Sequence, residues 1–159
     1  MGRMYTVVFQ AVSVSAQQDL FEITPADDKP VRIHAIRLSQ SGTADFGDAQ
    51  EEGLRVACIR GHSTGGSGGS APTPRPTNRS DAAAGFTAEV NNTTIASVGT
   101  PLQLDESCWN VRMPGDFIWT PETRLEASQA DTTIVMRLLT TPADAISTVS
   151  GTLYVEELG

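Results

Sequence analysis

The sequence has few of the residues on which disulfide-stapled, metal-binding or membrane-spanning proteins depend. Its 159 residues include two cysteines, two histidines and one lysine, and only 6% are aromatic. Two cysteines are too few for a disulfide scaffold, and two histidines far apart in the sequence disfavour a clustered metal site. The longest apolar runs, such as 134–136, are far shorter than the roughly 20 residues that a membrane-spanning helix needs.

The charge balance is acidic, with 19 Asp and Glu against 11 Lys and Arg and a formal net charge of −8. Phosphate contacts depend on surplus Lys and Arg, so we expect no nucleic-acid partner. The first residues contain no apolar signal-peptide region, and we expect a soluble, non-secreted protein without a membrane partner. All basic residues except Lys29 are arginines, which indicates either an interface-rich surface or a bias of the genome.

A hydrophobic period of two residues dominates the chain and predicts β-strands. The segments with this pattern or with many β-branched and aromatic residues are 5–14, 19–23, 31–38, 54–59, 108–113, 116–120, 123–127, 132–139 and 147–158. Helical structure is expected only as single turns, at 80–85 and 141–144. The pattern predicts an all-β fold, an antiparallel β-sandwich or jelly roll of about eight to ten strands. We expect residues 1–159 to form one domain.

Two glycines have a specific expected role. Pro114-Gly115 suits the centre of a type II turn, with Gly115 at positive φ, and predicts a hairpin-like corner between 108–113 and 116–120. Gly151, inside the last expected strand, indicates a bulge or a close backbone contact.

The two cysteines differ in their expected surroundings. Cys58 alternates with Leu54 and Val56 and is expected to be buried as a small hydrophobe. Cys108 lies beside Trp109, and the pattern leaves open whether its side chain faces the core or the solvent. We expect two free thiols, although a bridge between them stays open.

One long Gly/Ser/Pro-rich segment, residues 61–80, interrupts the strand pattern. It contains no large apolar side chain, so it cannot offset its own ordering entropy by burial. Its glycine-rich first half is expected to be flexible and its proline-rich second half stiff and extended. We interpret it as an excursion within one domain that becomes ordered only against a partner, with a disordered loop as the alternative.

No group of residues predicts catalysis, a metal or a cofactor. His34 on a strand face is expected to be hydrogen-bonded rather than a ligand. The glycines at 65–69 lack the Lys and the helix of a phosphate-binding loop. The carboxylates Asp45, Asp48, Glu51 and Glu52 do not have the spacing of a calcium loop, and we expect a solvated acidic turn. The chain is therefore not expected to be an enzyme or to hold a cofactor.

Three aromatic residues lie around Pro114-Gly115. Phe117 and Trp119 alternate onto one strand face, and Trp109 precedes the corner. They are expected to plug the core, but an exposed indole of Trp109 or Trp119 would instead anchor a protein contact or stack on a sugar.

The sequence as a whole resembles the small all-β decoration (cement) proteins that coat the capsids of tailed bacteriophages. The resemblance lies in residues 54–61, the excursion that follows them, residues 85–94 and residues 150–157. These families have no diagnostic motif, so the resemblance assigns no functional residue. It implies a jelly-roll-like sandwich, often a homotrimer, that sits on the capsid exterior of the virion and clamps subunits of the major capsid protein. Such a protein would be made in the host cytoplasm.

A binding role of this kind directs attention to residues that are free to contact a neighbour. The N-terminal segment, with Arg3 and Met4, is expected to add a strand to a neighbour's sheet edge. The other candidate contact residues are Gly65, Gly68, Pro72, Pro74, Arg75, Pro76, Arg79, Trp109 and Trp119. The alternatives are a carbohydrate- or protein-binding sandwich module of a virion tail or fibre, and a small hydrolase that uses His34 with an Asp and a Ser.

Overall fold

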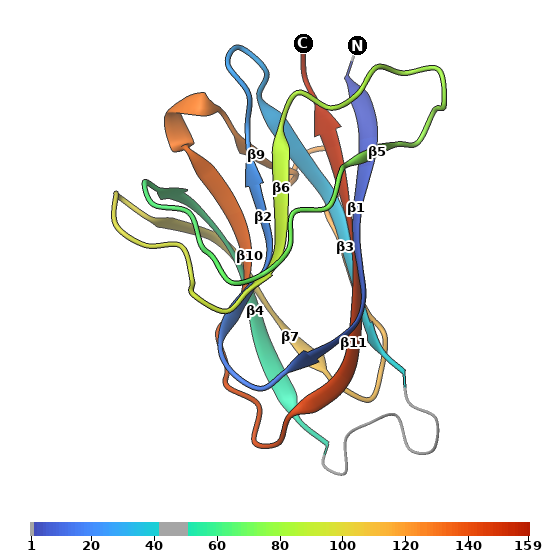
Figure 1. The fold of residues 1–159 in the computed structure, drawn as a ribbon, viewed down its shortest axis with the longest axis vertical. Coiled ribbons are helices and arrows are strands. Elements are labelled where there is room, and N and C mark those ends of the chain that lie inside the picture. Colours follow the sequence, from blue (N-terminus) through green and yellow to red (C-terminus); the bar gives the residue numbers. More distant parts are fainter. Residues whose placement is uncertain (1, 42–50) are drawn as a thin grey trace.

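A computed structural model describes residues 2–41 and 51–159, and nearly all regular secondary structure in these residues is β-strand (Figure 1). The strands and the short 3-10 helix of these described residues are β1 (Arg3–Val14), β2 (Gln18–Thr24), β3 (Val31–Gln40), β4 (Gly53–His62), β5 (Arg75–Pro76), β6 (Thr87–Asn92), β7 (Leu102–Asn110), β8 (Gly115–Ile118), β9 (Leu125–Ala127), η1 (Gln129–Asp131), β10 (Thr133–Leu138) and β11 (Ile146–Glu157).

The strands form two antiparallel sheets that pack face to face. A six-stranded sheet has the order β5-β1-β11-β3-β8, and β9 also pairs with β3. A five-stranded sheet has the order β6-β2-β10-β4-β7. The predicted all-β sandwich is confirmed.

The order of the strands gives the jelly-roll connection. Eight strands pair in nested sequence order, from the two ends of the chain toward its middle. β1 pairs with β11, β2 with β10, β3 with β8 and β4 with β7. Successive pairs lie in alternate sheets, so the chain behaves as one long hairpin wrapped around the core. Because Arg3 pairs with Glu157, the two ends of the described chain lie side by side (Figure 1).

Alternate residues of both sheets fill one continuous core. Tyr5, Val7 and Phe9 of β1 face inwards beside Leu153 and Val155 of β11, and all five side chains are buried. The close contact predicted at Gly151 is confirmed, because a Cβ there would lie 2.5 Å from the ring of Phe9. The ladder between β1 and β11 is irregular immediately after the pair of Phe9 with Gly151.

The predicted hairpin at Pro114-Gly115 is wrong. The flanking strands β7 and β8 lie in different sheets, and the chain turns earlier, where the Met113 amide donates to the Asn110 carbonyl over 3.0 Å. Gly115 begins β8 without a positive φ. A Cβ at Gly115 would lie 2.7 Å from the indole of Trp109, so this glycine gives the tryptophan room rather than closing a turn.

The two predicted helical turns are also wrong. Residues 80–85 continue from a turn around Asn78, whose side-chain oxygen accepts from the Ser80 amide over 3.1 Å. Residues 141–144 have no helical turn, and the short helix of the described chain lies at Gln129–Asp131 instead. Asn, Ser and Asp side chains compete with helical hydrogen bonds by bonding to nearby backbone, which explains the turn around Asn78.

Candidate functional site: the open face of the six-stranded sheet

The outer face of the five-stranded sheet, which we call the covered face, is covered at β2 and β10 by a ribbon made of residues 64–70 and 90–97. Residues 64–70 pair loosely with residues 90–97, through amides of Thr64, Ser67 and Ser70 that donate over 2.9–3.0 Å. Ala96 of this ribbon packs with Ala57, Ile59 and Val135 in a small apolar cluster on the covered face. As a result, every residue of β10 is buried, including those that point away from the main core.

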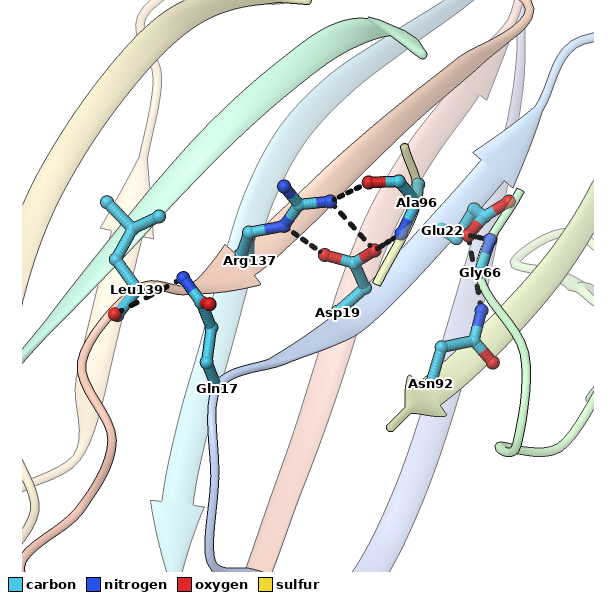
Figure 2. Close-up of polar contacts among 8 residues, drawn as sticks. All are labelled: Gln17, Asp19, Glu22, Gly66, Asn92, Ala96, Arg137 and Leu139. Carbon is cyan, nitrogen blue, oxygen red and sulfur yellow. Dashed lines mark hydrogen bonds and ion pairs between the residues drawn. The ribbon is translucent and has the colours of Figure 1, made fainter. Parts of the chain in front are cut away.

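A buried ion pair fastens the ribbon to the covered face (Figure 2). The guanidinium of Arg137 on β10 donates to both carboxylate oxygens of Asp19 on β2, over 2.5 and 3.1 Å. Arg137 also donates to the Ala96 carbonyl over 2.8 Å, and the Ala96 amide donates to Asp19 over 2.6 Å. Each charge is therefore matched, and both backbone groups of Ala96 are satisfied.

A second carboxylate, that of Glu22, binds the glycine-rich first half of the excursion. Glu22 on β2 accepts from the Gly66 amide over 2.8 Å and from the Asn92 side chain over 3.1 Å (Figure 2). Burial raises the pKa of the Glu22 carboxyl, and the charges of Glu89 and Asp19 raise it further, while the two hydrogen bonds oppose the shift.

The expectation that residues 61–80 are ordered only against a partner is therefore wrong. A Cβ at Gly65 would lie 2.6 Å from the Glu22 carboxylate, and one at Gly66 would lie 2.7 Å from the Thr94 carbonyl. Gly68 has a φ of +86°, which favours glycine. These glycines allow close packing instead of flexibility. Further along, β5 pairs with β1, and the Thr77 amide donates to the Met4 carbonyl over 2.9 Å.

The outer face of the six-stranded sheet, which we call the open face, is accessible. Its outward side chains are Met4, Thr6 and Val8 of β1, Thr152, Tyr154 and Glu156 of β11, Arg32, His34 and Arg37 of β3, and Asp116 and Ile118 of β8, and all are partly or fully exposed. Val8 is 39% exposed and Ile118 67% exposed. Exposed apolar side chains among charged ones are typical of a protein contact surface.

A hollow of about 300 Å³ lies on the open face over β3, β8 and β11. It is lined by Met4, His34, Ala35, Arg37, Ile118, Trp119, Arg124 and Tyr154. A second hollow, of about 430 Å³, lies between β1 and the excursion and is lined by Thr6, Val8, Phe9, Gln10, Pro72, Thr73 and Arg75.

Ion pairs fix several side chains of the open face. Glu156 accepts from His34 Nε2 over 2.8 Å and from Arg32 over 3.4 Å, which confirms the expectation that His34 is hydrogen-bonded. Arg37 pairs with Asp116 over 3.4 Å, and its guanidinium lies 5.7 Å from the centre of the Tyr154 ring. The last contact is within the range of a cation–π interaction.

The structure places the predicted contact residues in different surroundings. Met4 and Trp119 line the hollow over β3, and Pro72 and Arg75 line the hollow beside β1. Pro74 is partly buried, Pro76 pairs with Tyr5, and Arg79 is exposed in the turn around Asn78. Gly65 and Gly68 belong to the ribbon on the covered face.

The expectation that the N-terminal segment adds a strand to a neighbour is wrong. Arg3 and Met4 belong to β1 and pair with Glu157 and Glu156 of the same chain. On its other side, the Met4 carbonyl accepts from Thr77, so the backbone there has no free edge.

The two tryptophans differ in exposure. Trp109 is 2% exposed. This confirms that it packs in the core, and the alternative of an exposed Trp109 indole that contacts a protein or a sugar is wrong. Trp119 is half-buried, and its indole N–H donates to Asp105 over 3.2 Å. Phe117 and Trp119 both pack against the core, as the alternation predicted.

Sequence reasoning missed Arg37, Arg124, Ile118 and Tyr154, which complete the hollow. The period of two in the last strand already separated Tyr154 from the buried Leu153 and Val155, so its outward position was available from the pattern. Arg124 follows β8 in an irregular segment, and no local pattern brings it to the face of β3.

The other candidate groups are accounted for individually. Asp45 and Asp48 of the expected acidic turn lie outside the described residues, whereas Glu51 accepts from Asn110 over 2.7 Å and Glu52 accepts from the Ala143 amide over 2.9 Å. Within residues 2–41 and 51–159, no three His, Cys, Asp or Glu side chains are grouped so that they could hold a metal ion. The described part of the chain also contains no helix that is long and apolar enough to cross a membrane.

Both cysteines are free thiols, as predicted. Cys58 is buried in the core, and burial raises the pKa of its thiol far above the usual range. Cys108 is exposed on β7, the outermost strand of its sheet.

Comparisons of the chain with protein-family models, with curated proteins and with solved structures give no match.

Proposed function

We propose that this protein is a structural component of a virion that decorates the exterior of a phage capsid and stabilises it by binding the major capsid protein. The proposed role is binding without catalysis or a cofactor. We infer a homotrimer, made in the host cytoplasm and assembled onto the capsid through the open face.

The observation that supports this proposal is that the two outer faces of the sandwich differ in how far the chain itself covers them. Residues 64–70 and 90–97 form a ribbon over the outer face of the five-stranded sheet, and the pair of Asp19 and Arg137 binds Ala96 of this ribbon. The outer face of the six-stranded sheet has Val8 and Ile118 exposed beside charged side chains. The other exposed large apolar residues of the described chain lie outside this sheet, and they are Val98, Leu102 and Met113. Exposed apolar side chains lose contact with water when a partner covers them, which favours association.

The proposal is tested by mixing the purified protein with capsids of the virus that encodes it and measuring co-sedimentation. We expect saturable binding and a higher temperature for genome release from decorated capsids. Ile118→Asp should weaken binding about tenfold or more, because it places a charge at the centre of the contact. The matched control is Val98→Asp, since Val98 is similarly exposed, at 70%, but directly follows the ribbon and does not belong to the open face.

Failure of the wild-type protein to bind capsids at any concentration would refute the proposal. Light scattering tests the trimer separately, with a mass three times that of the chain as the expected result.

A second candidate is a carbohydrate- or protein-binding module of a virion tail or fibre. The observation behind this candidate is that the aromatic residues Trp119 and Tyr154 line the hollow, and a sugar would need a free face of one of these rings. A shift of the tryptophan emission on addition of neutral oligosaccharides would support it, and an unchanged emission would weigh against it.

A further inference from the structure

The hollow over β3, β8 and β11 is basic, although the chain is acidic. Three of its eight lining residues, His34, Arg37 and Arg124, carry basic groups, and none carries a carboxylate. The chain as a whole has a formal net charge of −8. Since Glu156 and Asp116 pair with His34 and Arg37 from outside the lining, Arg124 is the basic group of the hollow that favours a ligand of negative charge.

Arg124 differs from the other basic residues of the hollow because it has no ion-pair partner among residues 2–41 and 51–159. His34 is bonded to Glu156, and Arg37 is paired with Asp116. Within the described residues, Arg124 makes no hydrogen bond or ion pair, its Nε is buried without a partner, and its charge interacts at longer range with that of the exposed Glu122. A guanidinium has five N–H donors in a rigid fork, and a carboxylate is the group that matches this fork in a bidentate manner.

Apolar side chains surround these charges. Met4, Ala35 and Ile118 line the same hollow, and Ile118 is largely exposed. A ligand that fits this lining therefore has a carboxylate next to apolar groups. An Asp or Glu side chain beside an apolar residue, on an extended segment of a protein, has this chemistry.

The aromatic rings of the hollow are less suited to a sugar than to a protein segment. The Arg37 guanidinium already lies over the Tyr154 ring, and the Trp119 indole is half-buried with its N–H bonded to Asp105. Stacking on a sugar needs a free ring face, whereas side-chain packing against a ring edge does not.

We propose that this hollow binds an Asp or Glu side chain on a surface segment of the protein partner, with Arg124 as the bidentate donor and with an apolar neighbour of that residue packed on Met4 and Ile118. The inference rests on the proposed function, because it specifies the chemistry of the capsid-protein segment that the open face contacts.

The experiment uses the full chain labelled with ¹⁵N and two synthetic peptides that differ in one residue type. The first peptide alternates Glu with Val, and the second has Gln in place of every Glu. The chain has two tryptophans, so two indole N–H signals are expected. We expect the Glu peptide to shift the Trp119 signal in a saturable manner that weakens with added salt, and to leave the Trp109 signal unchanged.

Arg124→Gln should weaken the Glu peptide about tenfold or more, because it removes the charge and the fork together. Arg79→Gln is the matched control, since it removes the same charge from an exposed turn that does not line the hollow, and it should leave the affinity unchanged. Arg124→Lys keeps the charge and loses the fork, so it should give an intermediate affinity even if the Gln variant folds poorly. Equal binding of the Glu and Gln peptides, or equal affinity of the Arg124 and Arg79 variants, would overturn the inference.

The same variants separate this inference from the proposed function. If wild-type protein and Arg124→Gln bind capsids equally well, the acidic-segment inference is wrong while the decoration role stands. If the Glu peptide binds the hollow but the wild-type protein does not bind capsids, the decoration role is wrong. A fall in solution mass to that of one chain in Arg124→Gln would identify a second copy as the occupant, and would overturn the assignment to a partner protein.

Discussion

Arg137 and Asp19 form a two-contact ion pair across β10 and β2, and their side chains are 8% and 0% exposed. The pair lies between the sheet and the ribbon that covers it, where both charges are desolvated. A buried pair of this kind contributes little compared with an apolar pair, but removing one partner leaves an uncompensated charge.

Replacing either partner alone should therefore be costly. We expect Arg137→Ala to lower the free energy of unfolding by about 3–5 kcal/mol, and Asp19→Ala to do the same. Because each loss includes the same broken pair, the double variant should lose much less than the sum. Chemical denaturation of the four proteins measures this coupling, and additive losses would contradict it.

Glu22 gives a pH-dependent prediction. Burial raises the pKa of its carboxyl in the folded state, so the folded protein binds this proton more tightly than the unfolded chain does. Protonation of Glu22 therefore favours folding as the pH falls from neutral toward its unfolded pKa. Glu22→Gln should raise the melting temperature at neutral pH, and the gain should vanish at a pH below both pKa values.

The exposed Glu122 is the control for this measurement. Hydrogen bonds with its own backbone and with Thr120 lower the pKa of its carboxyl, so Glu122→Gln should not stabilise the protein at neutral pH. A gain from Glu22→Gln that is the same at every pH would contradict the buried-carboxyl explanation.

Gly66 tests whether the excursion is packed or flexible. A methyl group there would lie 2.7 Å from the Thr94 carbonyl, so Gly66→Ala should cost about 1–3 kcal/mol of stability. In a flexible loop the same change would be neutral or slightly stabilising, because it restricts the unfolded chain. Gly53→Ala is the control and should cost less stability. Its methyl group would lie 3.0 Å from the side chain of Cys108, which is exposed and can move aside.

The cysteines predict a simple thiol count. Cys108 is exposed, and Cys58 is buried with the pKa of its thiol raised by desolvation. An aromatic disulfide reagent should therefore react with one thiol per folded chain and with two in denaturant. Rapid reaction of both thiols in the folded protein would show that the core opens readily.

Much of the fold was predictable from local pattern, because a two-residue period states which side of each strand is buried. The long-range pairing was not, since nothing local in Asp19 or Arg137 indicates a partner 118 residues away. The excursion was misread because the glycines of residues 61–80 were taken only as a source of chain entropy, and Gly115 was misread as a turn residue. Gly66 and Gly115 both allow close approach to another part of the chain, which depends on the tertiary structure. The hollow was only partly predictable, because Arg124 reaches it from an irregular segment.

The pairing of β1 with β11 has a consequence for synthesis on the ribosome. β1 leaves the ribosome well before its neighbour β11, so the six-stranded sheet stays incomplete until Glu157 has been made. During that interval the apolar side of β1, with Tyr5, Val7 and Phe9, lacks its native cover. Nascent chains of this protein should consequently depend on chaperones, and their folding should be slow for a domain of this length.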